Sequence, residues 1–115
     1  MKPILLSILL ASNVAVGGVL CNTPADCDRK WSDAHEAVEM VTRMRIKYSA
    51  GDRAETFYPT TPGRMGGVIM RMSNDDGSKT IGVRLYCYNG VNPRLCDDAK
   101  RSGEEVFDLL VDRPQ

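Results

Sequence analysis

The chain has 115 residues, the length of a single small domain. Hydrophobic residues make up 43% and charged residues 26%, which is ordinary for a folded protein and argues against disorder. Basic and acidic residues balance at 15 each, so no net charge favours nucleic acid or acidic lipid. With one histidine, His35, and no nucleotide-binding loop or paired CxxC motif, we expect a non-enzymatic protein without cofactor, metal or nucleic-acid partner.

The N-terminal segment differs in composition from the rest of the chain. Lys2 supplies a short positive start, and apolar residues follow over 4–11 and again over 14–20. The next charge after Lys2 is Asp26, so the layout is that of a bacterial secretory signal. We therefore expect residues 1–20 to be a signal peptide and residues 21–115 to form one small domain.

Two routes of processing remain open at the end of this segment. Ala15 and Gly17 place small residues where signal peptidase needs them for cleavage after Gly17. Alternatively Cys21 carries a lipid, although only Val19 fits the residues expected before a lipid-bearing cysteine. We favour a lipid anchor at Cys21, which would make the chain an outer-membrane lipoprotein facing the periplasm; without the lipid it would be a soluble periplasmic protein.

The first stretch behind Cys21 predicts a helix. Thr23 is suited to cap a helix, Pro24 to its first position and Asp26 to its first turn. Apolar residues then recur at spacings of three and four up to about Thr42, at Cys27, Trp31, Ala34, Val38 and Val41. The charged residues between them are expected to face solvent.

Four short strands are predicted after this helix. Met44, Ile46 and Tyr48 alternate with polar residues, and a turn at 50–52 separates them from a second strand over 53–58. A loop over 59–64 precedes a third strand over 65–73, with Val68, Met70 and Met72 on one face. A turn at 74–78 leads into a fourth strand over 79–88, whose inward residues are Ile81, Val83, Leu85 and Cys87.

A second helix closes the chain. Apolar residues from Leu95 to Leu110 indicate it, but Gly103 weakens its middle and Ser102 offers a new cap, so we expect the firm helix over 103–111. The expected fold class is α+β: an N-terminal helix, a four-stranded antiparallel sheet and a C-terminal helix, with the helices on one sheet face.

The cysteines allow three pairings if all four are bonded. We favour Cys87–Cys96, because a short turn-rich loop separates the end of a strand from the last helix. Cys27–Cys87 is the competing pair, since both residues lie on predicted core faces. A lipid on Cys21 would leave one of the other three unpaired.

Cys21, Cys27 and Trp31, then residues 55–59 (Glu-Thr-Phe-Tyr-Pro), then Cys87 and Cys96 occur in this order along the chain. The arrangement resembles a group of small uncharacterised proteobacterial lipoproteins. The resemblance covers most of the domain with short motifs and implies an envelope location. It implies no activity and no catalytic residues.

The uncovered face of the predicted sheet is the main candidate site. We expect it to carry Arg71, Arg84, Tyr86 and Tyr88, together with Arg45, Lys47 and Glu55. Arginine and aromatic side chains anchor many protein interfaces, although cross-strand pairing on a wet face would also explain them. The leading hypothesis is an envelope protein acting through contacts with an unknown envelope or secreted protein. The alternative is an inhibitor or immunity protein against a secreted hydrolase or toxin, using this face or the loop over 59–64.

Overall fold

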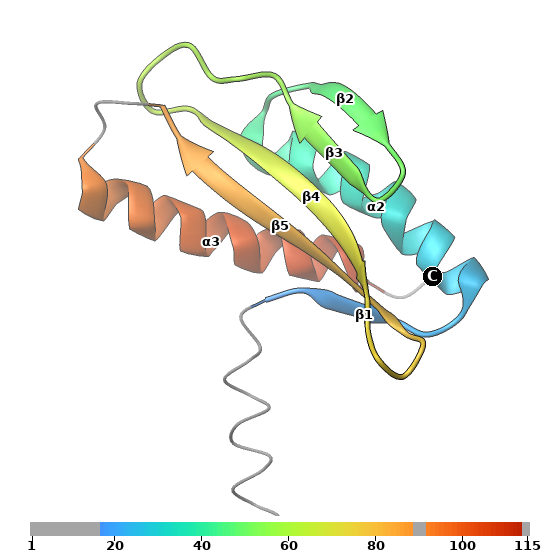
Figure 1. Cartoon of the computed structure of the whole chain (residues 1–115). Coiled ribbons are helices and arrows are strands. Elements are labelled where there is room, and N and C mark those ends of the chain that lie inside the picture. The colour runs from blue at the N-terminus through green and yellow to red at the C-terminus, as the bar shows by residue number, and fades with distance from the viewer. Residues whose placement is uncertain (1–16, 89–91, 114–115) are drawn as a thin grey trace, which may run out of the picture.

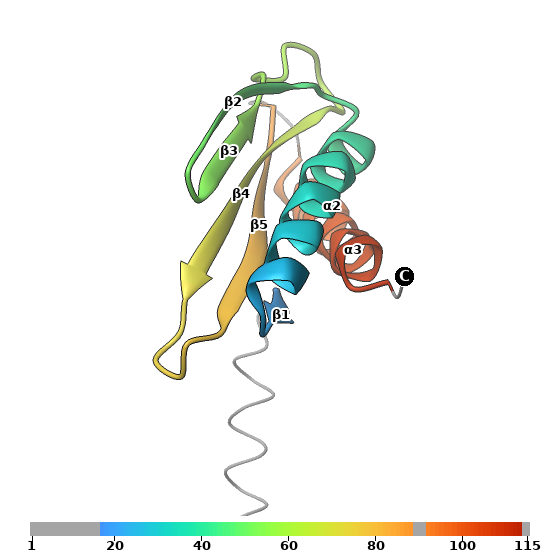
Figure 2. The ribbon, with the colours of Figure 1, turned by 90° about the vertical axis from the view of Figure 1, so that its right-hand side faces the viewer.

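The structure is a computed structural model and describes residues 17–88 and 92–113. Five strands form one antiparallel sheet in the order β1-β5-β4-β3-β2, and two helices cover a single face of it (Figures 1 and 2). The elements are β1 (Val19–Cys21), α2 (Pro24–Thr42), β2 (Ile46–Ala50), β3 (Arg53–Thr56), β4 (Met65–Ser73), β5 (Lys79–Cys87) and α3 (Pro93–Val111). The α+β class is confirmed, with one strand more than the sequence predicted.

Helix α2 has the bounds that the sequence predicts. The Thr23 hydroxyl accepts a hydrogen bond from the Asp26 backbone N–H at 3.1 Å, and Pro24 occupies the first turn. The helix ends at Arg43, which adopts the left-handed conformation and donates its N–H to the Glu39 carbonyl at 2.7 Å. Its buried face includes the small residues Ala34 and Ala37, which let the helix pack closely.

Helix α3 is continuous, so the prediction of a firm helix only over 103–111 is wrong. Asn92 caps its start, and the Asn92 side-chain oxygen accepts a hydrogen bond from the Arg94 N–H at 2.9 Å. Gly103 is buried, and a Cβ atom there would lie 2.7 Å from Leu85 Cδ1 and 3.0 Å from Val41 Cγ1. The glycine therefore marks a close contact between α3, the sheet and α2 rather than a break.

The core lies between the helices and the sheet. Ile69, Ile81 and Leu85 face the helices from β4 and β5, and Phe107 and Val111 of α3 pack against them. All five are almost fully buried. The inward residues predicted for β5 are therefore correct.

A bulge in β2 changes which residues of that strand share a face. Ile46 lies opposite Thr56, but Tyr48 lies opposite Glu55, so the register shifts between the two. Ile46 consequently packs on the helix side, whereas Tyr48 joins Glu55 on the other side. The expected simple alternation of Met44, Ile46 and Tyr48 is wrong because of this extra residue.

Strand β1 is the element that the sequence analysis missed. Val19 lies opposite Ile81 and is 5% exposed, and Cys21 is fully buried. The expected domain boundary after residue 20 therefore falls inside a strand of the sheet. Residues 1–16 of the expected signal peptide lie outside the described residues.

Two disulfides tie helix starts to the sheet. Cys87 is bonded to Cys96, the pair that the sequence favoured, and Cys21 is bonded to Cys27. The competing pair Cys27–Cys87 is therefore wrong. A lipid on Cys21 would need the same sulfur that bonds to Cys27, so the structure contradicts the expected lipid anchor at Cys21.

Candidate functional site

One face of the sheet carries no helix, as the turned view shows (Figure 2). We call it the open face. Cross-strand register places on it Tyr48, Glu55, Val68, Met70, Met72, Arg84 and Tyr86. Arg84 and Tyr86 therefore lie where the sequence predicted them. Met70 and Met72 lie there too, on the face of β4 that the sequence predicted them to share with Val68.

Tyr86 forms the centre of this face. Its ring lies across Gly66, where a Cβ atom would come within 2.6 Å of it. The ring of Tyr58 packs on Tyr86 at 5.3 Å between centroids and a tilt of 31°, while Tyr58 itself remains 62% exposed. Partial burial raises the pKa of the Tyr86 hydroxyl above its ordinary value. The two rings make a fixed aromatic step with one exposed surface.

Tyr58 comes from the loop between β3 and β4, so this loop continues the open face. Phe57 and Tyr58 are both exposed, and the following Pro59 is almost fully buried. The backbone N–H of Phe57 also donates to the Arg45 carbonyl at 2.8 Å. The buried proline and this hydrogen bond hold the loop against the domain. Sequence reasoning placed these two aromatics in a strand and considered only residues 59–64 as a loop.

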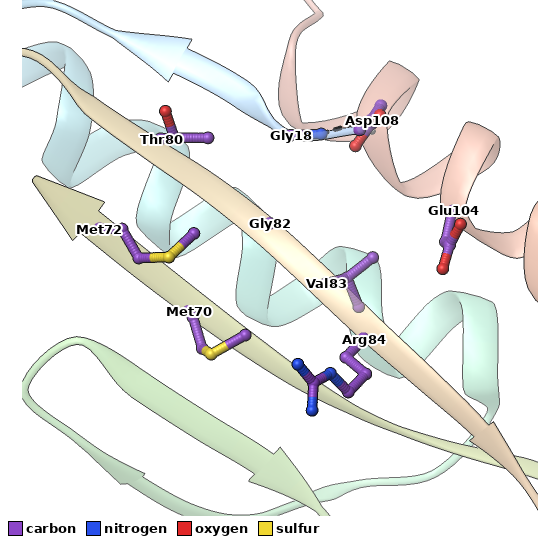
Figure 3. A pocket seen from close by; sticks show the side chains of 10 residues that line it. Gly18, Met70, Met72, Thr80, Gly82, Val83, Arg84, Glu104 and Asp108 are labelled. Atoms are coloured by element: carbon purple, nitrogen blue, oxygen red, sulfur yellow. Dashed lines mark hydrogen bonds between the residues drawn. The ribbon is translucent and has the colours of Figure 1, made fainter. Parts of the chain in front are cut away.

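A hollow lies along β4 and β5, with Arg84 among the residues that line it. It has a volume of about 180 Å³ and opens beside Gly82, where no atom lies within 4 Å of the position of a Cβ. Figure 3 shows the side chains of Met70, Met72 and Arg84 around it. Arg84 is exposed and belongs to none of the ion pairs found in the described part of the chain. We call Tyr58, Met70, Met72, Arg84 and Tyr86 together the tyrosine surface.

Arg71 does not belong to the open face, so that prediction is wrong. It lies two residues after the buried Ile69 and therefore on the same face of β4. Its guanidinium lies 5.0 Å from the centre of the Trp31 ring on α2. Its Nε also donates to Asp52 Oδ1 at 2.9 Å. Both faces of β4 are apolar, so alternation alone could not show which one the helices cover.

Tyr88 and two acidic pairs lie outside the strands of the sheet. Tyr88 follows β5 and its backbone N–H donates to the Arg64 carbonyl at 3.1 Å. Asp75 and Asp76 lie in the turn after β4, whereas Asp97 and Asp98 lie at the start of α3, near the opposite end of the hairpin (Figure 1). These acidic pairs therefore form no common surface.

The residues suited to acid–base or metal chemistry have structural roles. His35 Nδ1 lies 2.8 Å from the Trp31 carbonyl oxygen, and its Nε2 lies 2.9 Å from Ser49 Oγ. Asp76 accepts hydrogen bonds from the backbone and hydroxyl of Ser78, and the hydroxyl contact is the main cause that lowers its pKa. Within residues 17–88 and 92–113, no group of three His, Cys, Asp or Glu side chains is placed to hold a metal ion.

Comparison with known proteins gives no relative. No protein-family model, curated protein or solved structure matches the chain. The resemblance to small proteobacterial lipoproteins therefore stays a prediction. No helix in the described part of the chain has the length and apolar character needed to cross a membrane.

Proposed function

We propose that this chain is an exported, non-enzymatic domain that binds another protein through the tyrosine surface. The observation that carries the proposal is the exposed Tyr58 ring, stacked on Tyr86 beside the exposed Arg84, on the open face of the sheet. Tyrosine and arginine are enriched among the residues that dominate binding energy, and methionine adapts to irregular partner surfaces.

The geometry lowers the entropic cost of binding. Tyr86 is held over Gly66 and Tyr58 is held by the buried Pro59, so neither ring needs to be ordered by a partner. Arg84 offers an exposed guanidinium, which pairs best with a carboxylate. The partner proposed here presents an apolar patch with an Asp or Glu side chain at its edge.

Export is supported by two features. The N-terminal segment has the composition of a secretory signal, and all four cysteines are paired. Disulfides persist in oxidising compartments such as the bacterial periplasm and are rare in the cytosol. Because Cys21 is bonded to Cys27, we propose a soluble periplasmic or secreted domain.

The exposed loop at Phe57 and Tyr58 favours a second, narrower function, which is inhibition of a secreted hydrolase. Phe57 and the outer surface of Tyr58 are exposed next to the buried Pro59, so both are available to contact the walls of an enzyme cleft. The same residues would then occupy the cleft of the enzyme instead of contacting a flat partner surface. This alternative differs from the first only in what the partner is.

The test is capture of partners with matched variants. The full chain, expressed with its own N-terminal segment in a Gram-negative host, is purified in its oxidised form and immobilised. Envelope and culture-fluid proteins of the source organism are passed over the wild type, Tyr58→Ala, Arg84→Ala and the control Met40→Ala, whose exposed side chain lies on α2. A partner retained by the wild type and by the control should be lost from the other two.

The captured partner is then purified and titrated against each variant by calorimetry. We expect the Kd to rise at least tenfold for Tyr58→Ala and to stay within twofold for Met40→Ala. Equal binding by all four proteins would contradict the proposal. If the partner is a hydrolase, loss of its activity on binding supports the inhibitor function, and unchanged activity refutes it.

A further inference from the structure

The start of the described chain contacts the last helix through one hydrogen bond. The backbone N–H of Gly18 donates to Asp108 Oδ2 at 3.3 Å, and Figure 3 shows this contact at the edge of the hollow. A Cβ atom at Gly18 would lie 2.8 Å from the Thr80 methyl carbon, so only glycine fits without displacement of Thr80. The absent side chain lets the chain lie close to β5 at this position.

Asp108 lies near other acidic side chains, which do not stabilise the negative charge of its carboxylate. Its carboxylate is half-buried, and burial is the main cause that raises its pKa. Glu104, Glu105 and Asp112 of α3 line the two hollows beside it, and Arg84 lines one of them from β5. None of the ion pairs in the described residues includes Asp108.

The ammonium group of Lys30 on α2 already contacts other groups. The Lys30 ammonium donates to the Leu20 carbonyl at 2.9 Å and lies 3.4 Å from Asp26 and 3.6 Å from Asp112. Asp108 is thus a half-buried carboxylate that faces a backbone nitrogen instead of a cation. A positive charge on that nitrogen would form an ion pair with the Asp108 carboxylate.

The sequence before Gly18 offers a way to create that charge. Ala15 and Gly17 place small residues at the two positions that signal peptidase reads. Cleavage after residue 20 would remove Val19, which is buried and paired with Ile81. Cleavage between Gly17 and Gly18 keeps β1 complete.

We propose that export processing hydrolyses the Gly17–Gly18 peptide bond and that the new α-ammonium group of Gly18 forms an ion pair with Asp108, which fastens β1 to α3. Water adds across the bond, so Gly17 receives the carboxylate and Gly18 the amine. The amine takes up a proton near neutral pH, where an α-amino group is mostly charged. The proposal rests on the export half of the proposed function and does not involve the tyrosine surface.

The first experiment is the intact mass of the periplasmic product after expression of the full chain. A mass matching residues 18–115 with two disulfides is expected. Any other first residue, or a lipid on Cys21, would overturn the cleavage site. A full-length chain retained in the cytosol would refute export and, with it, the cleavage and the ion pair, but it would not bear on partner binding by the tyrosine surface.

The second experiment tests the ion pair on the processed protein. Gly18 is compared with Nα-acetyl-Gly18, prepared by peptide ligation, each with Asp108 and with Asp108→Asn. Acetylation removes the charge but keeps an N–H donor. We expect it to lower the folding equilibrium constant about tenfold with Asp108, which corresponds to one pKa unit of interaction, and less than twofold with Asp108→Asn.

A third measurement needs no substitution, so it gives a result even if the Asp108→Asn variant does not fold. The Asp108 carboxyl carbon is followed by NMR across pH in the free-amine and acetylated proteins. The Asp108 pKa should be lower in the free-amine form, because a cation favours the carboxylate. A first residue of Gly18 with equal stabilities and equal Asp108 titration would overturn the ion pair while leaving export and partner binding untouched.

Discussion

Arg71 on β4 contacts Trp31 and Asp28 of α2 and Asp52 in the turn between β2 and β3. Its guanidinium lies over the Trp31 ring, donates to Asp52 at 2.9 Å and lies 3.8 Å from Asp28. The two carboxylates are mostly exposed, so the ion pairs contribute little. Stacking on Trp31 and burial of the aliphatic stem are therefore the main stabilising contributions of this residue.

Replacement of Arg71 measures that contribution. Arg71→Ala should lower the free energy of unfolding by about 1–2 kcal/mol, and Arg71→Lys should recover part of it, since an ammonium keeps the charge but loses planar stacking. Urea denaturation gives the values. Arg84→Ala, on the open face, is the matched control and should change stability by less than about 0.5 kcal/mol. Equal losses for Arg71 and Arg84 would contradict the assignment of their faces.

Tyr86 gives the open face a signal in alkaline titration. Partial burial favours its neutral form, so its pKa is raised in the folded state. The folded protein then holds this proton more tightly than the unfolded chain, and stability falls as pH rises from the ordinary tyrosine value through the folded one. Tyrosine absorbance should show a late ionisation that Tyr86→Phe removes. A late phase that survives in this variant would assign it to another tyrosine.

At the scale of elements, α2, the C-terminal half of α3 and the β4–β5 hairpin follow from local sequence. Thr23 and Pro24 define the start of α2, and the strict alternation from Ile81 to Cys87 defines β5. Strand β1 and the bulge of β2, which the sequence did not predict, have no signal in their local sequence. Val19 lies in an apolar run that looks like an export segment, and the bulge of β2 leaves no trace in composition.

Gly103 shows how tertiary contact overrides a local rule. Glycine normally weakens a helix, by about 1 kcal/mol relative to alanine. Here the position faces Leu85 and Val41 so closely that an added methyl group has no room. Helix propensity therefore favours alanine at this position, whereas packing favours glycine.

Gly103→Ala tests which effect is larger. We expect the variant to unfold about 1 kcal/mol more easily, because overpacking of a buried contact outweighs the gain in helix propensity. Gly82→Ala is the control, since nothing lies within 4 Å of its Cβ position, and it should be neutral or slightly stabilising. Thermal or urea unfolding decides. A stabilised Gly103→Ala protein would contradict the close approach of α3.

At the scale of the whole molecule, a small core is reinforced by two covalent links. Cys21–Cys27 joins β1 to α2, and Cys87–Cys96 joins β5 to α3. The sequence indicated the second link because its cysteines flank a short loop. It did not indicate the first, because Cys21 was assigned to a lipid and β1 was not foreseen. The tyrosine surface was likewise only half predicted, since Tyr58 comes from a loop that only the fold brings to Tyr86.

Removal of either disulfide should destabilise the domain by about 2–3 kcal/mol, the range that loop closure gives for rings of this size. Replacement of Cys21 and Cys27 together by serine should also free β1, so the amide of Ile81 should exchange faster with solvent. The Cys87/Cys96 double serine variant is the control and should leave that amide protected. Exchange at Ile81 that is unchanged in the first variant would contradict the role of Cys21–Cys27 in holding β1.

Photo-crosslinking in living cells can detect contact between the tyrosine surface and a partner protein. A benzophenone amino acid is placed at Tyr58 or, as the control, at Met40, which is equally exposed on α2. We expect one discrete adduct of higher mass from position 58 and none from position 40 after illumination. No adduct from position 58, or the same adducts from both positions, would contradict it.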